Sequence, residues 1–378
     1  MFGKKDPRPS EQIELEREVK KEVEYPRFVS YEMVEKWGDG IPTFAEADPR
    51  APEWKPTPVI PVDLTKDGLG EIFVKNEADR ESNPTGTIKD RAAWELATLY
   101  RDYARALYLK IRTGTLDKKE LERLVTPRLS LITAGNEGKA IAECFKQYDL
   151  PPPKLITGND TRATILSELI KLRADVYTTD LSRQLTPEDI KHISNNPDGI
   201  DITSIRAIEP SSVFYDWHVH ESFNEKPDEI YVPYGSGRLM ENYLVWQARS
   251  MRNESEGRRD PRLKVPISKV IAMNVFGAEP AEYPSDADKL AAPFKPFLLF
   301  KDEDISAVVN LSFTGSETGK SKITEEQIRQ AHQLLASQGI EAEPSGAAGL
   351  GLYIDRFEKG LVKKGKKILI VNTGKGLI

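Results

Sequence analysis

The stretch "NPTGTIKDR", from Asn83 to Arg91, places a lysine, Lys89, directly behind a Pro-Thr-Gly-Thr turn. The preceding segment, "GEIFVKNEA", is typical of a strand. The following segment, "RAAWELATLYRDYARALYL", repeats apolar residues at helical spacing and forms one broad apolar face. The pattern predicts that Lys89 lies near the first turn of a helix whose face is buried.

This position bears on the chemistry of Lys89. The positive end of a helix dipole disfavours a cation, and partial desolvation does the same. Both effects favour the neutral amine, so Lys89 is a candidate nucleophile for Schiff-base chemistry. A solvated surface lysine is the more common alternative, and the position alone leaves it open.

Composition limits the class of protein. A chain of 378 residues is long enough for two domains. The net charge of −6 gives no general attraction to nucleic acid or to an anionic membrane, and no apolar run approaches transmembrane length. The N-terminus lacks the apolar stretch of a secretory signal, so we expect a cytoplasmic protein. A lone cysteine, Cys144, excludes intrachain disulfides and thiolate metal clusters, and we expect no metal site.

The chain alternates strand and helix patterns after the Lys89 helix. "RLSLITAGN" is followed by "EGKAIAECFKQYDL", and the unit repeats, which predicts a parallel sheet. "TEEQ", from Thr324, is a capping box that opens a further helix. Residues 1–50 form a charged arm with one helical stretch, "QIELEREVKKEV".

One region interrupts the alternation. Residues 195–227 are predicted to be irregular. Within them, His218 and His220 of "WHVH" are expected on an extended stretch, facing the same side. Two histidines with no third ligand at useful spacing indicate surface or packing residues rather than a metal site.

Three predicted strands end in turns that contain glycine: "TAGNEG" from Thr133, "GSG" from Gly235 and "TGKG" from Thr373. Open parallel sheets bind ligands at the carboxyl ends of their strands. Glycines there let backbone amides approach an anion, and a following helix N-terminus adds its dipole. The turn at Gly235 is therefore a candidate phosphate site, with a simple tight turn between strand and helix as the alternative.

Taken in order, these stretches resemble the fold type II family of pyridoxal-phosphate enzymes. The family includes threonine synthase, cysteine synthase, serine/threonine dehydratases and the tryptophan synthase β chain. "TPVIPV" is similar to the family's lead-in, "VKNEADRESNPTGTIKDR" to its cofactor-lysine segment and "TAGNEGKAIA" to its substrate loop. "GIEAEPSGAAGLG" and "VNTGKGL" are similar to its two late motifs. The resemblance runs from about Thr57 to the C-terminus.

The resemblance implies a role for each matching residue. Lys89 would hold pyridoxal 5'-phosphate covalently and act as general base and acid at the substrate α-carbon. Asn136 would bind the phenolic oxygen of the cofactor. The hydroxyl of Thr373 would meet the pyridine nitrogen, and such a neutral partner favours elimination over transamination. The substrate carboxylate would bind the loop of Thr133, Ala134, Gly135, Asn136 and Glu137. The cofactor phosphate would bind the turn of Gly235, Ser236, Gly237, Arg238 and Leu239.

The resemblance also implies an α/β fold of two domains, each a mostly parallel sheet flanked by helices. The smaller domain would span 83–205, and the larger cofactor domain would combine 51–82 with 206–378. Family members commonly form homodimers, and the arm of residues 1–50 could contribute to that interface.

The implied activity is that of a lyase or synthase that acts on a small-molecule amino acid by elimination, or by elimination and replacement, as threonine synthase does. A β-replacement like that of cysteine synthase and a serine/threonine dehydratase are the alternatives within the family. Relatives usually carry a hydroxyl residue at the position of Ala134 and a small or neutral residue at that of Glu137. These departures leave open a third reading, a cofactor-binding protein with altered or lost catalysis.

Overall fold

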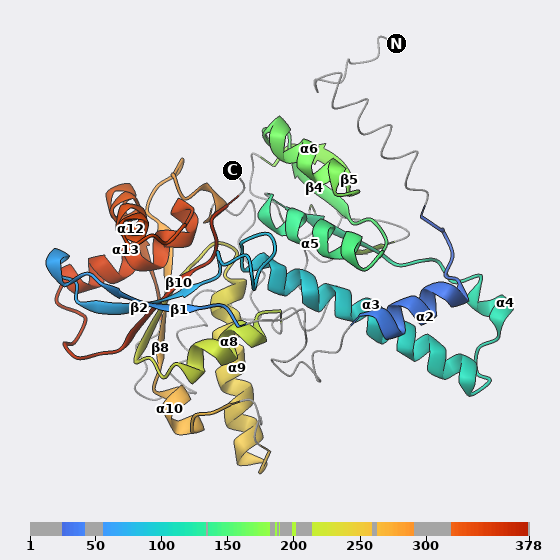
Figure 1. Cartoon of the computed structure of the whole chain (residues 1–378), viewed down its shortest axis with the longest axis horizontal. Coiled ribbons are helices and arrows are strands. Elements are labelled where there is room, and N and C mark those ends of the chain that lie inside the picture. The colour runs from blue at the N-terminus through green and yellow to red at the C-terminus, as the bar shows by residue number, and fades with distance from the viewer. Residues whose placement is uncertain are drawn as a thin grey trace, which may run out of the picture. The chain divides into compact units, whose positions relative to one another are not determined.

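The computed structural model describes most of the chain, and these residues form two compact units. The described residues within 1–48 and 92–208 form unit 1, and those within 49–91 and 209–376 form unit 2. Each unit contains its own sheet, which is mostly parallel in unit 2 and fully parallel in unit 1 (Figure 1). The domain boundaries predicted at residues 83 and 205 stay a prediction. The described residues are 25–41, 56–133, 135–181, 186, 189, 199–201, 214–258, 263–290 and 319–376.

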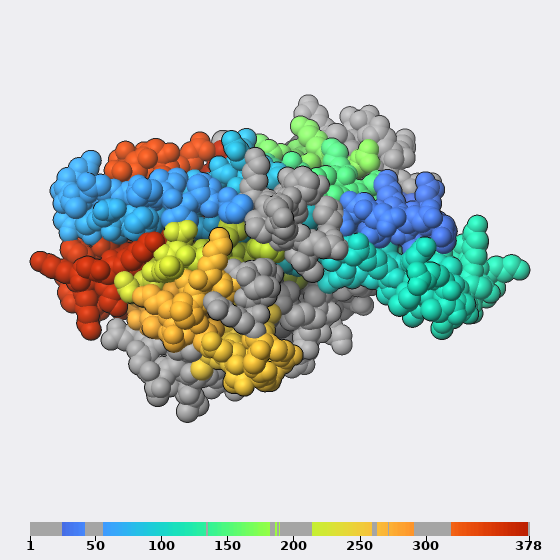
Figure 2. All heavy atoms as spheres, turned by 60° about the horizontal axis from the view of Figure 1, so that its bottom comes forward, coloured from blue at the N-terminus to red at the C-terminus, as the bar shows by residue number. Residues whose placement is uncertain are grey.

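Unit 2 is built on a six-stranded sheet in the order β1-β2-β10-β7-β8-β9. β1 pairs with β2 in antiparallel fashion, and every other neighbouring pair is parallel. The carboxyl ends of β2, β10 and β7 therefore lie at one edge of the sheet. β1 is an edge strand, and the β1–β2 segment, in light blue, forms part of the surface in Figure 2. The strands are β1 Val59–Asp63, β2 Glu71–Asn76, β7 Glu229–Pro233, β8 Asn274–Pro280, β9 Gly319–Ile323 and β10 Ile368–Asn372.

Helices cover both faces of this sheet. In Figure 1, α12 and α13 lie on one side of it, and α8 and α9 lie on the other. α12 starts at the predicted capping box, in which Gln327 N donates to Thr324 Oγ1 at 3.3 Å and Thr324 N donates to Gln327 Oε1 at 2.9 Å. The helices are α8 Asp216–Asn224, α9 Arg238–Ser255, α10 Ile267–Ile271, α12 Glu325–Ser337 and α13 Pro344–Glu358, with short 3-10 turns at Thr65–Asp67 and Asp288–Leu290.

Unit 1 contains a four-stranded, fully parallel sheet in the order β5-β4-β3-β6. Its core includes the rings of Trp37, Tyr100 and Phe145, which meet edge to face with centroids 5.3 and 5.4 Å apart. The strands are β3 Arg128–Ile132, β4 Lys154–Gly158, β5 Asp175–Thr179 and β6 Gly199–Asp201. The helices are α2 Tyr31–Gly40, α3 Lys89–Arg112, α4 Lys118–Leu121, α5 Asn136–Gln147 and α6 Ala163–Lys171; the first three residues of α3 belong to unit 2.

The predicted fold class, α/β with mostly parallel sheets flanked by helices, is confirmed. The predicted irregular stretch 195–227 is wrong, because strand β6 and helix α8 form within it. α8 is buried almost all round, including its histidines and a serine, so it lacks the alternation of polar and apolar faces by which a helix is found. The predicted helical stretch "QIELEREVKKEV" lies outside the described residues. Within the described part of the chain, every helix is too short or too polar to cross a membrane.

Candidate functional site

Lys89 is the first residue of α3, as the sequence predicts, and it is half-buried. The turn before it is held by its own side chains. The amide of Lys89 donates to Thr87 Oγ1 at 3.1 Å. Asp90 Oδ2 accepts from the amide of Thr85 at 3.0 Å and from its hydroxyl at 2.8 Å. The Pro-Thr-Gly-Thr turn thus fixes the backbone from which the lysine projects.

The same turn packs, backbone against backbone, on the segment after β10. Ile88 N donates to the carbonyl of Thr373 at 2.9 Å, and Thr87 forms an isolated antiparallel bridge with Gly374. A Cβ at Gly374 would lie 2.9 Å from the carbonyl oxygen of Gly86, and the φ of Gly374, +149°, also favours glycine. Two motifs nearly 300 residues apart therefore meet, and Thr373 lies beside the segment that carries Lys89.

The Gly235–Leu239 turn follows β7 and leads into α9. Gly237 precedes the helix with a φ of +77°. A Cβ at Gly235 would lie 3.3 Å from Leu290 Cα and from the carbonyl oxygen of Lys289, so a side chain there would require these neighbours to shift slightly. The first amides of a helix have no intrahelical partner and point outward. Because β10 lies between β2 and β7, this turn shares one edge of the sheet with Lys89 and Thr373.

The predicted substrate loop follows β3 in unit 1. Thr133 Oγ1 accepts hydrogen bonds from the amide of Gly135 at 3.2 Å and from that of Gly138 at 3.0 Å. Asn136 and Glu137 form the first turn of α5 and are half-buried. Ala134 lies outside the described residues. The loop belongs to the other unit, so the roles given to it stay predictions.

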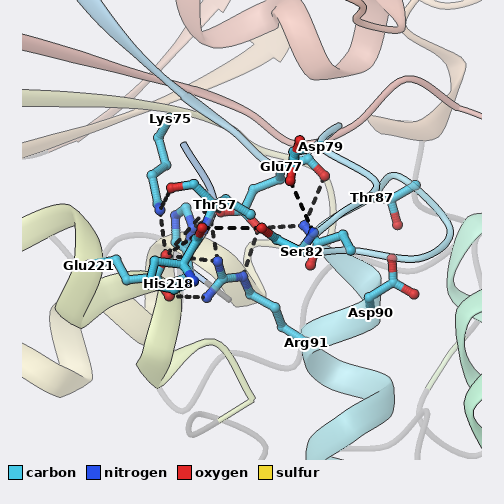
Figure 3. Close-up of polar contacts among 12 residues, drawn as sticks. Thr57, Lys75, Glu77, Asp79, Ser82, Thr87, Asp90, Arg91, His218 and Glu221 are labelled. Carbon is cyan, nitrogen blue, oxygen red and sulfur yellow. Dashed lines mark hydrogen bonds and ion pairs between the residues drawn. The ribbon is translucent and has the colours of Figure 1, made fainter. Parts of the chain in front are cut away.

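A buried cluster of charged side chains lies beside the turn that precedes Lys89 (Figure 3). We call it the Glu77 cluster; it comprises Thr57, Lys75, Glu77, Arg91, His218 and Glu221. Glu77 is fully buried and accepts four side-chain hydrogen bonds. The donors are Thr57 Oγ1 at 2.6 Å, Asn83 Nδ2 at 2.8 Å, Arg91 Nε at 2.7 Å and His218 Nδ1 at 2.8 Å. Asn83 and Arg91 are the two ends of the motif around Lys89, and Glu77 binds both.

Glu221, on α8, is the second acid of the Glu77 cluster. Arg91 binds it in bidentate fashion, with Nη1 and Nη2 each 2.9 Å from one carboxylate oxygen, and Lys75 Nζ also contacts it. Two cations thus face two carboxylates. Burial alone would raise the pKa of Glu221, but the charges of Arg91 and Lys75 lower it to about 2. Burial opposes ionisation of Glu77 as well, yet Arg91 above all holds its pKa well below the usual value. Both acids are therefore ionised at neutral pH.

His218 connects the cluster to α9. Its Nε2 lies 2.8 Å from the hydroxyl oxygen of Tyr243, which also lies 2.7 Å from Ser222 Oγ. Burial lowers the pKa of His218 and outweighs the opposite effect of Glu77, so the ring is neutral at pH 7. The expectation of an extended stretch here is wrong. His218 is a buried hydrogen-bonding residue of a helix, consistent with a packing role.

Tyr215, directly before α8, contacts Lys89 itself. Lys89 Nζ donates to the phenolic oxygen at 3.1 Å, and Tyr215 is buried. Neither Tyr215 nor the Glu77 cluster was found from the sequence. The one available signal was the placement of Lys75 and Glu77 in and just after the otherwise apolar run of β2, where unpaired charges would be costly.

Comparison with known proteins bears on this geometry. No protein-family model matches the sequence. The threonine synthase of Halalkalibacterium halodurans is 23% identical over 338 residues, which cover 85% of this chain and 82% of that protein. Among solved structures, Escherichia coli diaminopropionate ammonia lyase has a TM-score of 0.57 and 15% identity, covering 93% of this chain and 90% of its own. Maize serine racemase has a TM-score of 0.55 and 16% identity, covering 94% and 96%.

The chain is similar to threonine synthases over most of its length. It has the fold of the fold type II pyridoxal-phosphate enzymes, and the resemblance drawn from its motifs is confirmed. Within unit 2, Lys89, Thr373 and the Gly235–Leu239 turn lie at one strand edge of the sheet. This edge offers an amine, a neutral hydroxyl and a helix N-terminus.

Proposed function

We propose that this chain is a pyridoxal-phosphate-dependent lyase or synthase that removes a leaving group from an amino acid, with replacement as in threonine synthase. One observation carries the proposal. Lys89, Thr373 and the glycine turn before α9 lie at the same edge of one sheet, and the Lys89 turn is hydrogen-bonded to Thr373 at 2.9 Å. The similarity to threonine synthases and the shared fold support it.

The residues present fit the cofactor. Lys89 would hold it covalently, and the amides of Gly235, Ser236, Gly237, Arg238 and Leu239 would bind its phosphate, since a helix N-terminus favours an anion. Thr373 would offer its hydroxyl to the pyridine nitrogen, and Asn136 would bind the phenolic oxygen. When bound, the cofactor supplies an electron sink for negative charge at the substrate α-carbon.

The protein's own groups would do the rest. Lys89 Nζ would take the proton from the α-carbon and return it. Thr133 already accepts two amide hydrogen bonds, so both lone pairs of its hydroxyl are used and its O–H remains able to donate to a substrate carboxylate. The Gly135 amide already donates to the Thr133 hydroxyl, so a substrate carboxylate would have to compete with that hydroxyl for the amide. These assignments belong to the proposal.

A labelling experiment tests the cofactor site. Purified protein is incubated with pyridoxal 5'-phosphate, reduced with borohydride and mapped by peptide mass spectrometry. We expect the pyridoxyl group on Lys89 and its loss in Lys89→Ala. Lys375→Ala is the matched control, because Lys375 follows the neighbouring Thr-Gly motif and should leave the label in place. A label on another lysine, or none, would falsify the assignment.

A substrate panel tests the reaction. Amino acids with hydroxyl, phosphate or ester leaving groups are supplied, and ammonia, phosphate and keto acid are measured. Phosphate release with a new hydroxy amino acid favours the threonine-synthase-like reaction, whereas ammonia and keto acid indicate a dehydratase. If Lys89 is labelled but no substrate is turned over, the result favours the alternative of a cofactor-binding protein with altered or lost catalysis. The homodimer and the cytoplasmic location are parts of the proposal that mass measurement in solution and cell fractionation test.

A further inference from the structure

Lys89 and Arg91, two residues apart at the start of α3, both bind the segment that forms α8. Lys89 Nζ donates to the hydroxyl of Tyr215, which directly precedes the helix, at 3.1 Å. Arg91 binds Glu221, in the second turn, through two hydrogen bonds of 2.9 Å. Lys89 Nζ therefore contacts the residue that precedes α8, and α8 is itself held to the start of α3 by a buried, bidentate ion pair.

Tyr215 is itself held in place. Its backbone amide donates to Asn242 Oδ1 on α9 at 2.9 Å, and Asn242 Nδ2 donates to Asp216 Oδ1 at 2.7 Å. Arg249 Nη2 lies 2.7 Å from both carboxylate oxygens of Asp216. The start of α8 is thus tied to α9, the helix that follows the Gly235–Leu239 turn. Because Tyr215 is only 2% exposed, its ring has little room to rotate away from Lys89.

We propose that Tyr215 is a positioning residue for the Lys89 amine, holding Nζ in one orientation until it reacts with an aldehyde. The inference rests on the proposed function. In that reaction, the nitrogen of the neutral amine forms a double bond to the aldehyde carbon, and the aldehyde oxygen leaves as water with the two amine protons. A flexible lysine side chain loses rotamer freedom on reaction, and a fixed acceptor at 3.1 Å removes part of that freedom beforehand.

Positioning predicts a specific split between two ligands. Pyridoxal 5'-phosphate reacts with the amine, whereas pyridoxine 5'-phosphate has an alcohol in place of the aldehyde and binds without reaction. In Tyr215→Phe, we expect the rate of covalent capture, followed by absorbance, to fall about fivefold, the equivalent of one hydrogen bond. The affinity for pyridoxine 5'-phosphate, measured by tryptophan fluorescence, should change by less than about twofold, because this alcohol forms no bond with Nζ and does not need the amine held in one orientation.

Tyr243→Phe is the matched control. Tyr243 is buried beside α8 and its hydroxyl is hydrogen-bonded to Ser222, as Tyr215 is to Lys89, but Tyr243 belongs to the His218 side of the helix. Its variant should capture the aldehyde at the wild-type rate. Wild-type capture by Tyr215→Phe overturns the proposal. Equal loss of capture and of pyridoxine 5'-phosphate affinity also overturns it, since that result indicates a structural role alone.

A crystal structure of the cofactor-free protein separates this inference from the proposed function. We expect Nζ of Lys89 in one position beside Tyr215 in the wild type, and in several positions in Tyr215→Phe. An Nζ away from Tyr215 in the wild type contradicts the inference, whether or not the cofactor binds. If the contact between Lys89 Nζ and Tyr215 is present but the protein binds neither pyridoxal 5'-phosphate nor pyridoxine 5'-phosphate, the proposed function is contradicted. The role of Tyr215 in covalent capture is then contradicted as well.

Discussion

Glu77 and Arg91 form an ion pair that solvent does not reach, with Arg91 Nε 2.7 Å from Glu77 Oε2 and both side chains at most 1% exposed. The pair connects the end of β2 to the first turn of α3. The chain between them contains the whole Pro-Thr-Gly-Thr turn and Lys89. Buried pairs often add little net stability, because desolvation offsets their attraction. This pair instead connects the two ends of the segment that carries Lys89.

Removal of the Glu77 charge should be strongly destabilising. Glu77→Gln leaves Arg91 buried with an incomplete set of acceptors, and we expect a loss of about 3–5 kcal/mol in the free energy of unfolding, measured by denaturant titration. The double variant Glu77→Gln, Arg91→Met should cost less than the sum of the two single changes. Each single change already removes the ion pair between these two residues, so the pair is lost only once in the double variant.

An exposed ion pair provides the control for this prediction. Lys36 and Asp149 lie 2.6 Å apart, but each side chain is more than half exposed. Asp149→Asn should change the free energy of unfolding by less than about 1 kcal/mol. If Glu77→Gln is as mild as Asp149→Asn, the cluster does not hold the turn as we describe.

The free energy of unfolding should decrease in two stages as the pH is lowered. The pKa of His218 is lowered by burial below its ordinary value of 6.5, so the unfolded chain takes up a proton that the folded chain excludes. This contribution is present above pH 6.5 and is lost as the pH falls below that value. Glu77 and Glu221, also with lowered pKa values, contribute stability that is lost from pH 4.5 towards pH 2.

Denaturant midpoints between pH 8 and pH 3 measure this profile. His218→Gln should flatten the decline between about pH 6.5 and pH 5 and leave the acid stage intact, because the glutamine does not titrate. A wild-type stability that rises as the pH falls from 7 to 5 would have the wrong sign for a histidine buried in its neutral form.

Gly374→Ala should disturb the contact between the two glycine motifs. The added Cβ would lie 2.9 Å from the Gly86 carbonyl oxygen and 2.9 Å from Thr87 Cβ, in a region made of backbone that cannot move away cheaply. We expect a loss of about 1–3 kcal/mol in the free energy of unfolding and weaker uptake of pyridoxal 5'-phosphate. Gly360→Ala is the control: its φ is +69°, but a Cβ there meets no atom within 4 Å. Equal effects of the two changes on cofactor uptake would contradict a special role for the Gly374 contact.

The substrate loop offers a change towards its relatives. Ala134→Ser together with Glu137→Thr restores a hydroxyl at the first position and a neutral residue at the second, as relatives usually have. One added hydrogen bond to the substrate carboxylate should improve the affinity for ordinary family substrates about fivefold. Removal of the acid should help further, since like charges repel in a partly desolvated pocket. Affinities and turnover across the substrate panel measure the effect, and an unchanged profile would mean that these two positions do not set specificity.

The sequence determined the periodic parts of this protein. The alternation of strands and helices, the start of α3 at Lys89 and the capping box at Thr324 follow from local patterns, because spacing and turn chemistry act over a few residues. The motif order was sufficient to indicate the fold type II family. The strand pattern also placed Gly235 and Gly374 in turns after strands, although the neighbours that crowd them were not visible.

The tertiary structure decided what the chain buries together. Glu77 binds Arg91 and His218, which lie 14 and 141 positions further along the chain, and the contact between Lys89 and Tyr215 spans 126 positions. Spacing carries no signal for such pairs, and α8 lacks the polar face that would have marked it as a helix. From the sequence alone, a charged residue is predicted to lie in solvent, because the partner that would allow its burial is not visible. Lys75, Glu77 and Arg91 can lie in the interior only because folding places opposite charges and hydrogen-bond donors within 3 Å of them, which offsets the cost of leaving water.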